Sequence, residues 1–247
     1  MLKLVTALIT VRTTSTRLQK KCLLPFGNGN VLEHIIRRSL ASGIEPIVCT
    51  SVDCSDDIIE EIAVKEDVKL FRGSLVNKLK RWSDCATHFG LDAFHTIDAD
   101  DPFFDGKEII KSMELLAEKT YDMICPTKSS SAGGASVGYS LTTEIVKRAS
   151  DTIPVDTDTE MMWYYLERIP NLRMQVLAEE DLLPFKVRMT LDYEEDYWLL
   201  ESVRRILGNL ALRSQINKLF LNNPDLYLIN YFRNEEWQSA QLAKRLN

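Results

Sequence analysis

The sequence has few of the residues that build zinc sites and disulfide frameworks. Its 247 residues include five cysteines, an odd number with no C-x-x-C pair, and only three dispersed histidines. This distribution argues against a zinc site, a histidine-rich metal site or a set of disulfides. It favours free thiols in a reducing cytoplasm.

Long apolar runs and an excess of basic charge are also missing. No stretch approaches the ~20 apolar residues of a membrane span, and the apolar start of the chain runs into an arginine without a signal-peptidase site. The net charge of −6 argues against a general nucleic-acid binder, which would carry a basic domain or stripe. We therefore expect a soluble, cytoplasmic protein that binds neither nucleic acid nor membranes.

The first half of the chain alternates regularly between strand and helix patterns. Strands are predicted at Val5–Val11, Pro46–Thr50, Val68–Phe71, Ala93–Ile97 and Met123–Cys125. Helices are predicted at Val31–Ala41, from about Ser55, at Leu75–Phe89 and at Ile109–Leu116. This alternation with short connections is typical of an α/β fold with a doubly wound parallel sheet.

The regular alternation of strands and helices ends after about residue 127. Ser129–Gly134 is predicted to be a flexible loop. Further strands are expected at Ser136–Leu141, Leu172–Leu177 and Val187–Leu191. Further helices are expected at Thr143–Ala149, Thr159–Ile169 and Glu194–Leu207, and from about Leu212 and Glu235. The last two form a C-terminal tail, whose apolar residues, Trp237 among them, predict that it packs on the core.

A cationic, hydroxyl-rich loop follows the first predicted strand. Within ten residues it offers Arg12, Thr13, Thr14, Ser15, Thr16, Arg17, Lys20 and Lys21, with no acidic residue among them. A loop that is only a solvated surface would also be cationic. In an acidic chain, however, this concentration at the end of a strand favours a site for a polyphosphate.

Acidic residues follow two other predicted strands, at Asp98–Asp101 and at Asp192. Acids in such positions often cap helices, so each group alone is a weak signal. Ligands of open parallel sheets bind at the carboxyl ends of the strands, where these acids would face the cationic loop. Mg²⁺ needs only one or two carboxylates besides phosphate oxygens and water. The joint placement therefore favours a nucleotide site.

These segments also resemble one known family. The run from Arg12 to Leu23 resembles the R-x-x-S-T-R-L-P-G-K-x-L signature of the SpsF-like cytidylyltransferases, relatives of the CMP-KDO and CMP-sialate synthetases. Further similarity lies at Leu32–His34, Arg72–Ser74, Asp100–Pro102, Arg188–Asp196 and Asn223–Asn230. Their order and spacing hold across nearly the whole chain.

The resemblance implies a GT-A-like Rossmann nucleotidyltransferase fold, with a mostly parallel sheet, helices on both faces and a small β insertion. It implies a main domain at residues 1–207, with an insertion at about 135–185 that faces the acceptor or a partner in a homodimer. Residues 208–247 would form a helical extension packed on the core.

The resemblance further implies transfer of CMP from CTP to an acidic sugar, for surface polysaccharide or glycan precursor synthesis. The implied nucleotide-binding residues are Arg12, Thr14, Ser15, Thr16, Arg17 and Lys21, with Arg72 and Ser74 beside the nucleoside. Arg12, Arg17 and Lys21 would also be catalytic, and Asp100 and Asp192 would hold Mg²⁺.

The chain departs from the family pattern in three places. Gln19-Lys20 replaces Pro-Gly, Asn77 stands where an aspartate is common, and Met161–Trp163 replaces an E-H-V-like stretch. Two other functions therefore stay open. Asp98–Asp100 fits the D-x-D metal motif of a GT-A glycosyltransferase, and the departures would suit a nucleotide-binding relative without catalysis.

Overall fold

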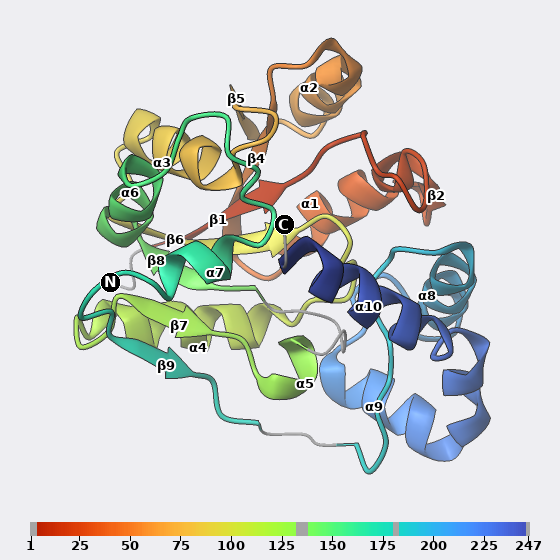
Figure 1. Cartoon of the computed structure of the whole chain (residues 1–247). Coiled ribbons are helices and arrows are strands. Elements are labelled where there is room, and N and C mark those ends of the chain that lie inside the picture. The colour runs from red at the N-terminus through yellow and green to blue at the C-terminus, as the bar shows by residue number, and fades with distance from the viewer. Residues whose placement is uncertain (1–3, 132–137, 180–182, 246–247) are drawn as a thin grey trace.

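Seven strands form the central sheet, in the order β5-β4-β1-β6-β8-β7-β9 (Figure 1), in a computed structural model that describes residues 4–131, 138–179 and 183–245. The strands are β1 (Val5–Thr10), β4 (Ile44–Ser51), β5 (Lys69–Gly73), β6 (Ala93–Asp98), β7 (Met123–Cys125), β8 (Ser140–Thr142) and β9 (Met174–Val176). β8 is antiparallel to both of its neighbours, and the other pairs are parallel. The predicted mostly parallel sheet is confirmed. A two-stranded ribbon, β2 (Pro25–Phe26) with β3 (Gly29–Asn30), lies apart from it.

Helices cover both faces of this sheet, as predicted. They are α1 (Val31–Ala41), α2 (Asp57–Lys65), α3 (Lys78–His88), α4 (Gly106–Ala117), α5 (Lys128–Ser131), α6 (Thr143–Asp151), α7 (Met162–Leu166), α8 (Glu194–Leu207), α9 (Arg213–Asn222) and α10 (Arg233–Arg245), with the 3₁₀ turns η1 (Lys21–Leu23), η2 (Cys54–Asp56) and η3 (Pro224–Ile229). Successive side chains of a strand point to opposite faces. Ala7 and Ile9 therefore join the core under α1 and α8, while Leu8 joins the core under α3 and α6 (Figure 1).

The helix α1 shows how local sequence sets an element boundary. Asn30 accepts a hydrogen bond from the Glu33 amide at 2.9 Å, and Glu33 accepts one from the Asn30 amide at 2.7 Å. This capping box satisfies two backbone donors that the first turn leaves open. The predicted bounds of α1, β7 and α8 agree with the structure.

The predicted strand at Val187–Leu191 is wrong. The segment forms no strand, because its backbone groups bond outside the sheet: the Leu191 amide donates to the Asp100 carbonyl at 2.7 Å, and the Arg188 carbonyl accepts from Asn230 at 2.9 Å. The β-branched residues of this segment favour a strand. The burial of the Arg188 side chain against Asp196 outweighs that preference. The segment still delivers Asp192 to the site.

The region from residue 128 to residue 177 also differs from its prediction. The expected loop at Ser129–Gly134 begins as the short helix α5, and residues 132–137 lie outside the described part of the chain. The expected strand Ser136–Leu141 starts only at Ser140, and the expected helix Thr159–Ile169 is reduced to α7. Sequence patterns of only a few residues set such boundaries poorly.

The C-terminal tail consists of α9, η3 and α10, which lie beside α8 in Figure 1. Phe220 of α9 is fully buried in the core. Leu228 of η3 is 57% exposed, so the apolar residues of the tail do not all pack inward. Among the described residues, none of the helices has the length and apolar character needed to cross a membrane.

Candidate active site

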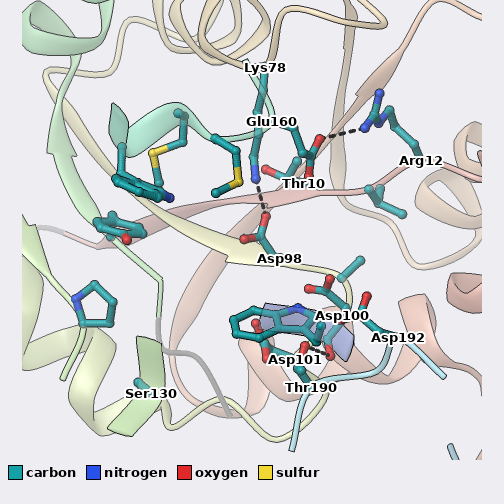
Figure 2. A pocket seen from close by; sticks show the side chains of 18 of the residues that line it. Thr10, Arg12, Lys78, Asp98, Asp100, Asp101, Ser130, Glu160, Thr190 and Asp192 are labelled. Atoms are coloured by element: carbon teal, nitrogen blue, oxygen red, sulfur yellow. Dashed lines mark hydrogen bonds and ion pairs between the residues drawn. The ribbon is translucent and has the colours of Figure 1, made fainter. Parts of the chain in front are cut away.

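A cavity of about 930 Å³ opens at the carboxyl ends of β1 and β6 (Figure 2). Predicted site residues that line it are Arg12, Thr14, Ser15, Thr16, Arg17, Lys21, Asp100 and Asp192. Lys78, Glu160, Tyr139, Trp163 and Trp237 line it as well. The structure thus brings the cationic loop and both acidic groups to one place.

Arg72 and Ser74 are not among the residues that line the cavity. The Arg72 guanidinium bonds the Glu60 carboxylate at 2.9 Å and the backbone carbonyls of Ser51 and Asp53. Ser74 accepts a hydrogen bond from the Asn77 amide at 3.1 Å. Both residues hold local structure near the ends of β4 and β5, and a contact with the nucleoside stays a prediction.

The cationic loop is anchored at its start by Asp56. This buried carboxylate accepts hydrogen bonds from the Thr13 amide and the Thr13 hydroxyl, both at 2.8 Å, and from the hydroxyls of Thr50 and Ser51. Burial raises the pKa of Asp56, but its bonds to Ser51 and Thr13 outweigh that effect and leave the pKa below the ordinary value. The sequence predicted only a helix start here, because nothing in it joins residue 13 to residue 56.

Asp56→Asn is therefore expected to destabilise the fold by about 2–3 kcal/mol, since an amide cannot accept all these bonds and its NH₂ would face the Thr13 donor. Urea unfolding measures the effect, with Asp57→Asn, the exposed neighbour, as the matched control. An Asp56→Asn variant as stable as the control would contradict the assigned role.

Lys20 lies in the loop at the position where the resembling family has glycine, and its backbone is left-handed, with φ 51° and ψ 33°. This conformation costs a residue with a Cβ roughly 1 kcal/mol, and it costs glycine nothing. The replacement of Pro-Gly by Gln19-Lys20 thus keeps the shape of the loop at some cost in stability.

Lys20→Gly is accordingly expected to raise the stability of the fold by about 0.5–1 kcal/mol and the melting temperature by ~2 °C. Thermal unfolding measures the change. Gln19→Gly is the control, since Gln19 does not have a positive φ and glycine should not stabilise the chain there. Equal effects of the two substitutions would contradict the account of strain.

Lys21 is the centre of the ionic contacts in the cavity. Its Nζ lies 2.9 Å from Asp100 Oδ2, 2.9 Å from Asp192 Oδ1 and 2.8 Å from the Leu191 carbonyl. Burial would lower the pKa of Lys21, but the charges of Asp100 and Asp192 outweigh burial and raise it. Lys21 is therefore fully protonated at neutral pH, and its charge is fixed in place.

The two carboxylates on Lys21 differ in their surroundings. Burial raises the pKa of Asp100, and the neighbouring Asp192 charge adds to this against the opposite effect of Lys21. Burial acts on Asp192 too, but the cations Lys21 and Arg17 dominate there and lower its pKa. Arg17 itself lies 2.8 Å from Asp192 Oδ1. Asp192 is thus the firmly ionised member of the pair.

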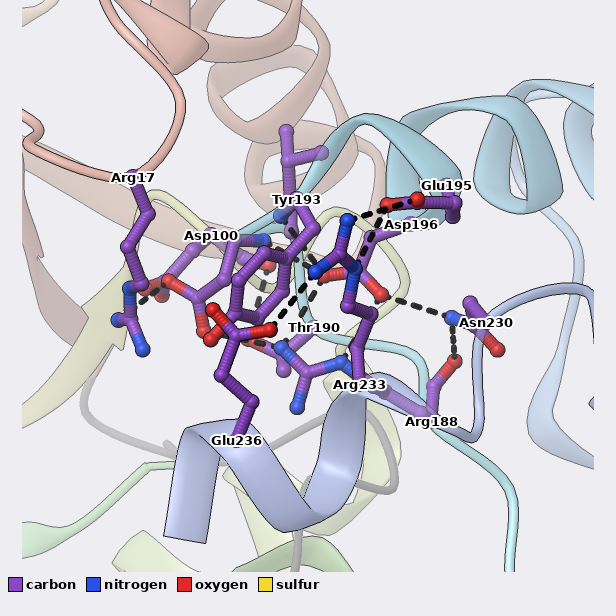
Figure 3. A network of polar contacts seen from close by, with 12 residues as sticks. Arg17, Asp100, Arg188, Thr190, Tyr193, Glu195, Asp196, Asn230, Arg233 and Glu236 are labelled. Atoms are coloured by element: carbon purple, nitrogen blue, oxygen red, sulfur yellow. Dashed lines mark hydrogen bonds and ion pairs between the residues drawn. The ribbon is translucent and has the colours of Figure 1, made fainter. Parts of the chain in front are cut away.

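A buried network of polar side chains supports Asp192, and Figure 3 labels its members Arg188, Asp196 and Asn230. Arg188 bonds Asp192 Oδ2 at 3.1 Å and Asp196 Oδ1 at 2.9 Å, and both Arg188 and Asp196 are fully buried. Asp196 also accepts the amide of Asp192 at 2.9 Å, and Asn230 bonds Asp196 from the C-terminal tail. These bonds fix both the backbone and the side chain of Asp192.

Two further ion pairs cross the upper part of the cavity (Figure 2). Arg12 lies 2.7 Å from Glu160, and Lys78 lies 2.8 Å from Asp98. Burial would lower the pKa of Lys78, but the charges of Asp98 and Glu160 raise it. The sequence predicted a site role for neither Lys78 nor Glu160. Lys78 is one of many helical lysines, and only the fold brings it to the end of β6.

The carboxylates fit a divalent cation. Asp100 and Asp192 converge on one point, now taken by the Lys21 ammonium, and two carboxylates are enough for Mg²⁺ when phosphate oxygens complete its ligands. No group of three His, Cys, Asp or Glu side chains suited to a metal occurs among the described residues. A metal ion would therefore bind here only together with a phosphate group, whose oxygens would complete its set of ligands.

The chain is similar to known proteins over most of its length. The profile of the cytidylyltransferase family matches residues 6–220. Two curated relatives are an uncharacterised protein of Methanocaldococcus jannaschii, 28% identical over 90% of this chain and 93% of the relative, and the spore coat polysaccharide biosynthesis protein SpsF of Bacillus subtilis, 27% identical over 88% of this chain and 94% of the relative.

Two solved structures share the fold. A cytidylyltransferase from Leptospira borgpetersenii superposes with a TM-score of 0.80 at 24% identity, over 91% of this chain and 96% of its own. A CMP:2-keto-3-deoxy-manno-octonic acid synthetase complexed with CTP superposes with a TM-score of 0.60 at 13% identity, over 84% of this chain and 99% of its own. The predicted nucleotidyltransferase fold is confirmed.

Proposed function

Since this chain belongs to the cytidylyltransferase family and is therefore a nucleotidyltransferase, we propose that it transfers CMP from CTP to an acidic sugar and releases pyrophosphate. The observation that carries the proposal is the position of Lys21, bonded to both Asp100 and Asp192 at the foot of the cationic loop. The likeness to SpsF supports a product used in surface polysaccharide synthesis.

Ion pairs fix the positions of the cationic side chains that would bind the triphosphate. Arg12, Arg17 and Lys21 all bond carboxylates, at 2.7 to 2.9 Å, so their side chains are ordered before a ligand binds. Phosphate oxygens of CTP would replace carboxylate oxygens as their partners, which exchanges one set of charged hydrogen bonds for another. Thr14, Ser15 and Thr16 offer hydroxyls and amides beside them.

An acceptor oxygen would attack the α-phosphorus in line, and the bond from that phosphorus to the bridging oxygen of pyrophosphate would break. Lys21 and Arg17 would stabilise the negative charge that grows on the departing pyrophosphate, which is the main contribution a protein makes to phosphoryl transfer. Asp100 and Asp192 would hold Mg²⁺, which would neutralise phosphate charge at the reacting centre.

Pyrophosphate release from CTP and Mg²⁺, measured with a panel of acidic sugars, tests the proposal. We expect release that depends on one of the sugars and stops when the metal is chelated. UDP-sugar binding tighter than CTP in calorimetry would instead favour a D-x-D glycosyltransferase. The two acids of that motif bond different lysines here, Asp98 to Lys78 and Asp100 to Lys21. CTP binding without turnover on any acceptor would indicate an inactive relative.

We also propose a homodimer formed through about residues 135–185. In support, β9 is the last strand of the sheet among the described residues, so one of its backbone edges is open to pairing with a second chain. Sedimentation of the full chain measures the oligomeric state. The five free cysteines support action in the cytoplasm.

A further inference from the structure

The C-terminal helix α10 contributes one residue, Trp237, to the lining of the active-site cavity. The family match ends at residue 220, whereas α10 spans Arg233–Arg245. Figure 1 shows α10 extending from the side of α8 and α9 toward the middle of the view, and Trp237 in this helix lines the cavity. This residue therefore comes from a segment that the family profile does not include.

The start of α10 is tied to the segment that carries Asp192 (Figure 3). Arg233 bonds both oxygens of the Glu195 carboxylate, at 2.9 and 3.1 Å, and its guanidinium lies 4.9 Å from the centre of the Tyr193 ring. Asn230, just before α10, is buried and bonds the Arg188 carbonyl. The contacts of Arg233 with Glu195 and Tyr193, and the buried side-chain amide of Asn230, thus fix the position of the first turn of α10.

Trp237 lies next to Arg188, the buried cation that bonds Asp192. The guanidinium of Arg188 lies 5.6 Å from the centre of the indole ring, and the same guanidinium bonds Asp192. Arg188 is fully buried and pairs with Asp192 and Asp196, and its NH1 has no hydrogen-bond partner within the described structure. The face of the indole adds a cation–π contact to these two ion pairs. One residue therefore separates Trp237 from the acid assigned to the metal.

We propose that Trp237 is a substrate-binding residue, which contacts the ribose-phosphate part of CTP and shields the α-phosphate from water. The inference rests on the proposed function, because CTP is the ligand. Arg233 is a positioning residue that acts through α10. A cavity wall made of indole excludes water on the side of Asp192, where a stray water molecule would otherwise compete with the acceptor for the α-phosphorus.

Tryptophan fluorescence of the full chain during titration with CTP and Mg²⁺ tests the proposal, because the readout needs no acceptor. Trp237→Phe is expected to lose the part of the CTP-induced emission change that does not come from Trp163, the other tryptophan that lines the cavity. Trp198→Phe, which alters a tryptophan that is 55% exposed on α8 and does not line the cavity, is the control and should keep the change.

Calorimetry of Trp237→Ala should show a Kd for CTP about tenfold higher than that of the native chain, with Trp198→Ala unchanged. A native emission change in Trp237→Phe with a native Kd in Trp237→Ala would overturn the inference and leave the proposed function standing. Tighter binding in Trp237→Ala would overturn it too, since the indole would then block the ligand. If the native chain does not bind CTP, both the proposed function and this inference fail.

Charge reversal tests the positioning role of Arg233. Arg233→Glu is expected to reduce the emission change from Trp237 and to raise the Kd for CTP about threefold, and Arg233→Glu with Glu195→Arg should restore both. Melting temperatures of the two variants separate this effect from loss of the fold. Arg233→Glu with a native emission change would overturn the positioning role.

Discussion

Replacing Lys21 with alanine is expected to reduce kcat for CTP about 10²–10³-fold, because a preorganised cation at the reacting centre contributes that much to phosphoryl transfer. The same change removes the one cation that bonds both Asp100 and Asp192 among the described residues, each at 2.9 Å from its Nζ. The two carboxylates would then repel each other and hold the triphosphate less well. The Michaelis constant for CTP should therefore rise as kcat falls.

Steady-state pyrophosphate release measures both parameters for Lys21→Ala. Lys20→Gly is the matched control, since it removes the neighbouring cation of the same loop and should keep nearly native turnover. A melting curve shows whether the variant is folded at the assay temperature. Turnover of Lys21→Ala within tenfold of the native rate would contradict the role assigned to Lys21.

Replacing Asp196 with alanine is expected to destabilise the fold by about 3–5 kcal/mol, because it removes one of the two carboxylates that balance the charge of the fully buried Arg188 and leaves only Asp192, at 3.1 Å. It also removes the acceptor of the Asp192 amide, so Asp192 should lose its fixed position. Urea unfolding measures the loss. Glu194→Ala, which changes an exposed residue in the first turn of the same helix, should stay within about 0.5 kcal/mol of the native chain.

A double variant separates stability from function. Arg188→Met with Asp196→Leu replaces the buried charges by apolar side chains, and such replacements often recover the stability that a single change loses. We expect recovered stability without recovered turnover, because the Asp192 amide would lose its acceptor Asp196 and the Asp192 carboxylate would lose Arg188. A single Asp196→Ala variant that loses less than about 1 kcal/mol would contradict the assigned network.

Much of the fold follows from local sequence, because its central elements carry strong patterns. β1 is a run of buried aliphatic residues, and α1 begins with the Asn30 and Glu33 capping box that the structure shows. The parallel order follows from the strand–helix alternation. The strand prediction for Val187–Leu191 was wrong, because the strand propensity of the segment competes with the burial of Arg188. The partner that decides the conformation, Asp196, lies eight residues further along the chain.

The site could be predicted only where its residues stand close together in the sequence. The cationic loop and the acids after two strand patterns were visible in this way, and the structure brings Lys21, Asp100 and Asp192 into contact. Asp56 and Trp237 could not be found, because their roles depend on contacts across 43 residues and on the path of the C-terminal tail. No periodicity or composition encodes such contacts.

The structure shows that Gln19-Lys20 can replace the Pro-Gly of the family pattern without moving Lys21 away from Asp100 and Asp192. Lys20 stands where the family pattern has glycine, and it adopts a left-handed conformation that glycine would adopt without strain. The chain therefore turns into η1 at Lys21. The cost falls on stability, at roughly 1 kcal/mol. The Lys21 ammonium nevertheless reaches both carboxylates.

The most direct test of the central claim follows the phosphate itself. CTP labelled at the α-phosphate is incubated with Mg²⁺, the native chain and the acidic sugar that supports pyrophosphate release. Attack at the α-phosphorus predicts that the label leaves CTP with the sugar, as a CMP adduct, in a one-to-one ratio with unlabelled pyrophosphate. Label found in free CMP or CDP, with none on the sugar, would contradict the proposed cytidylyl transfer.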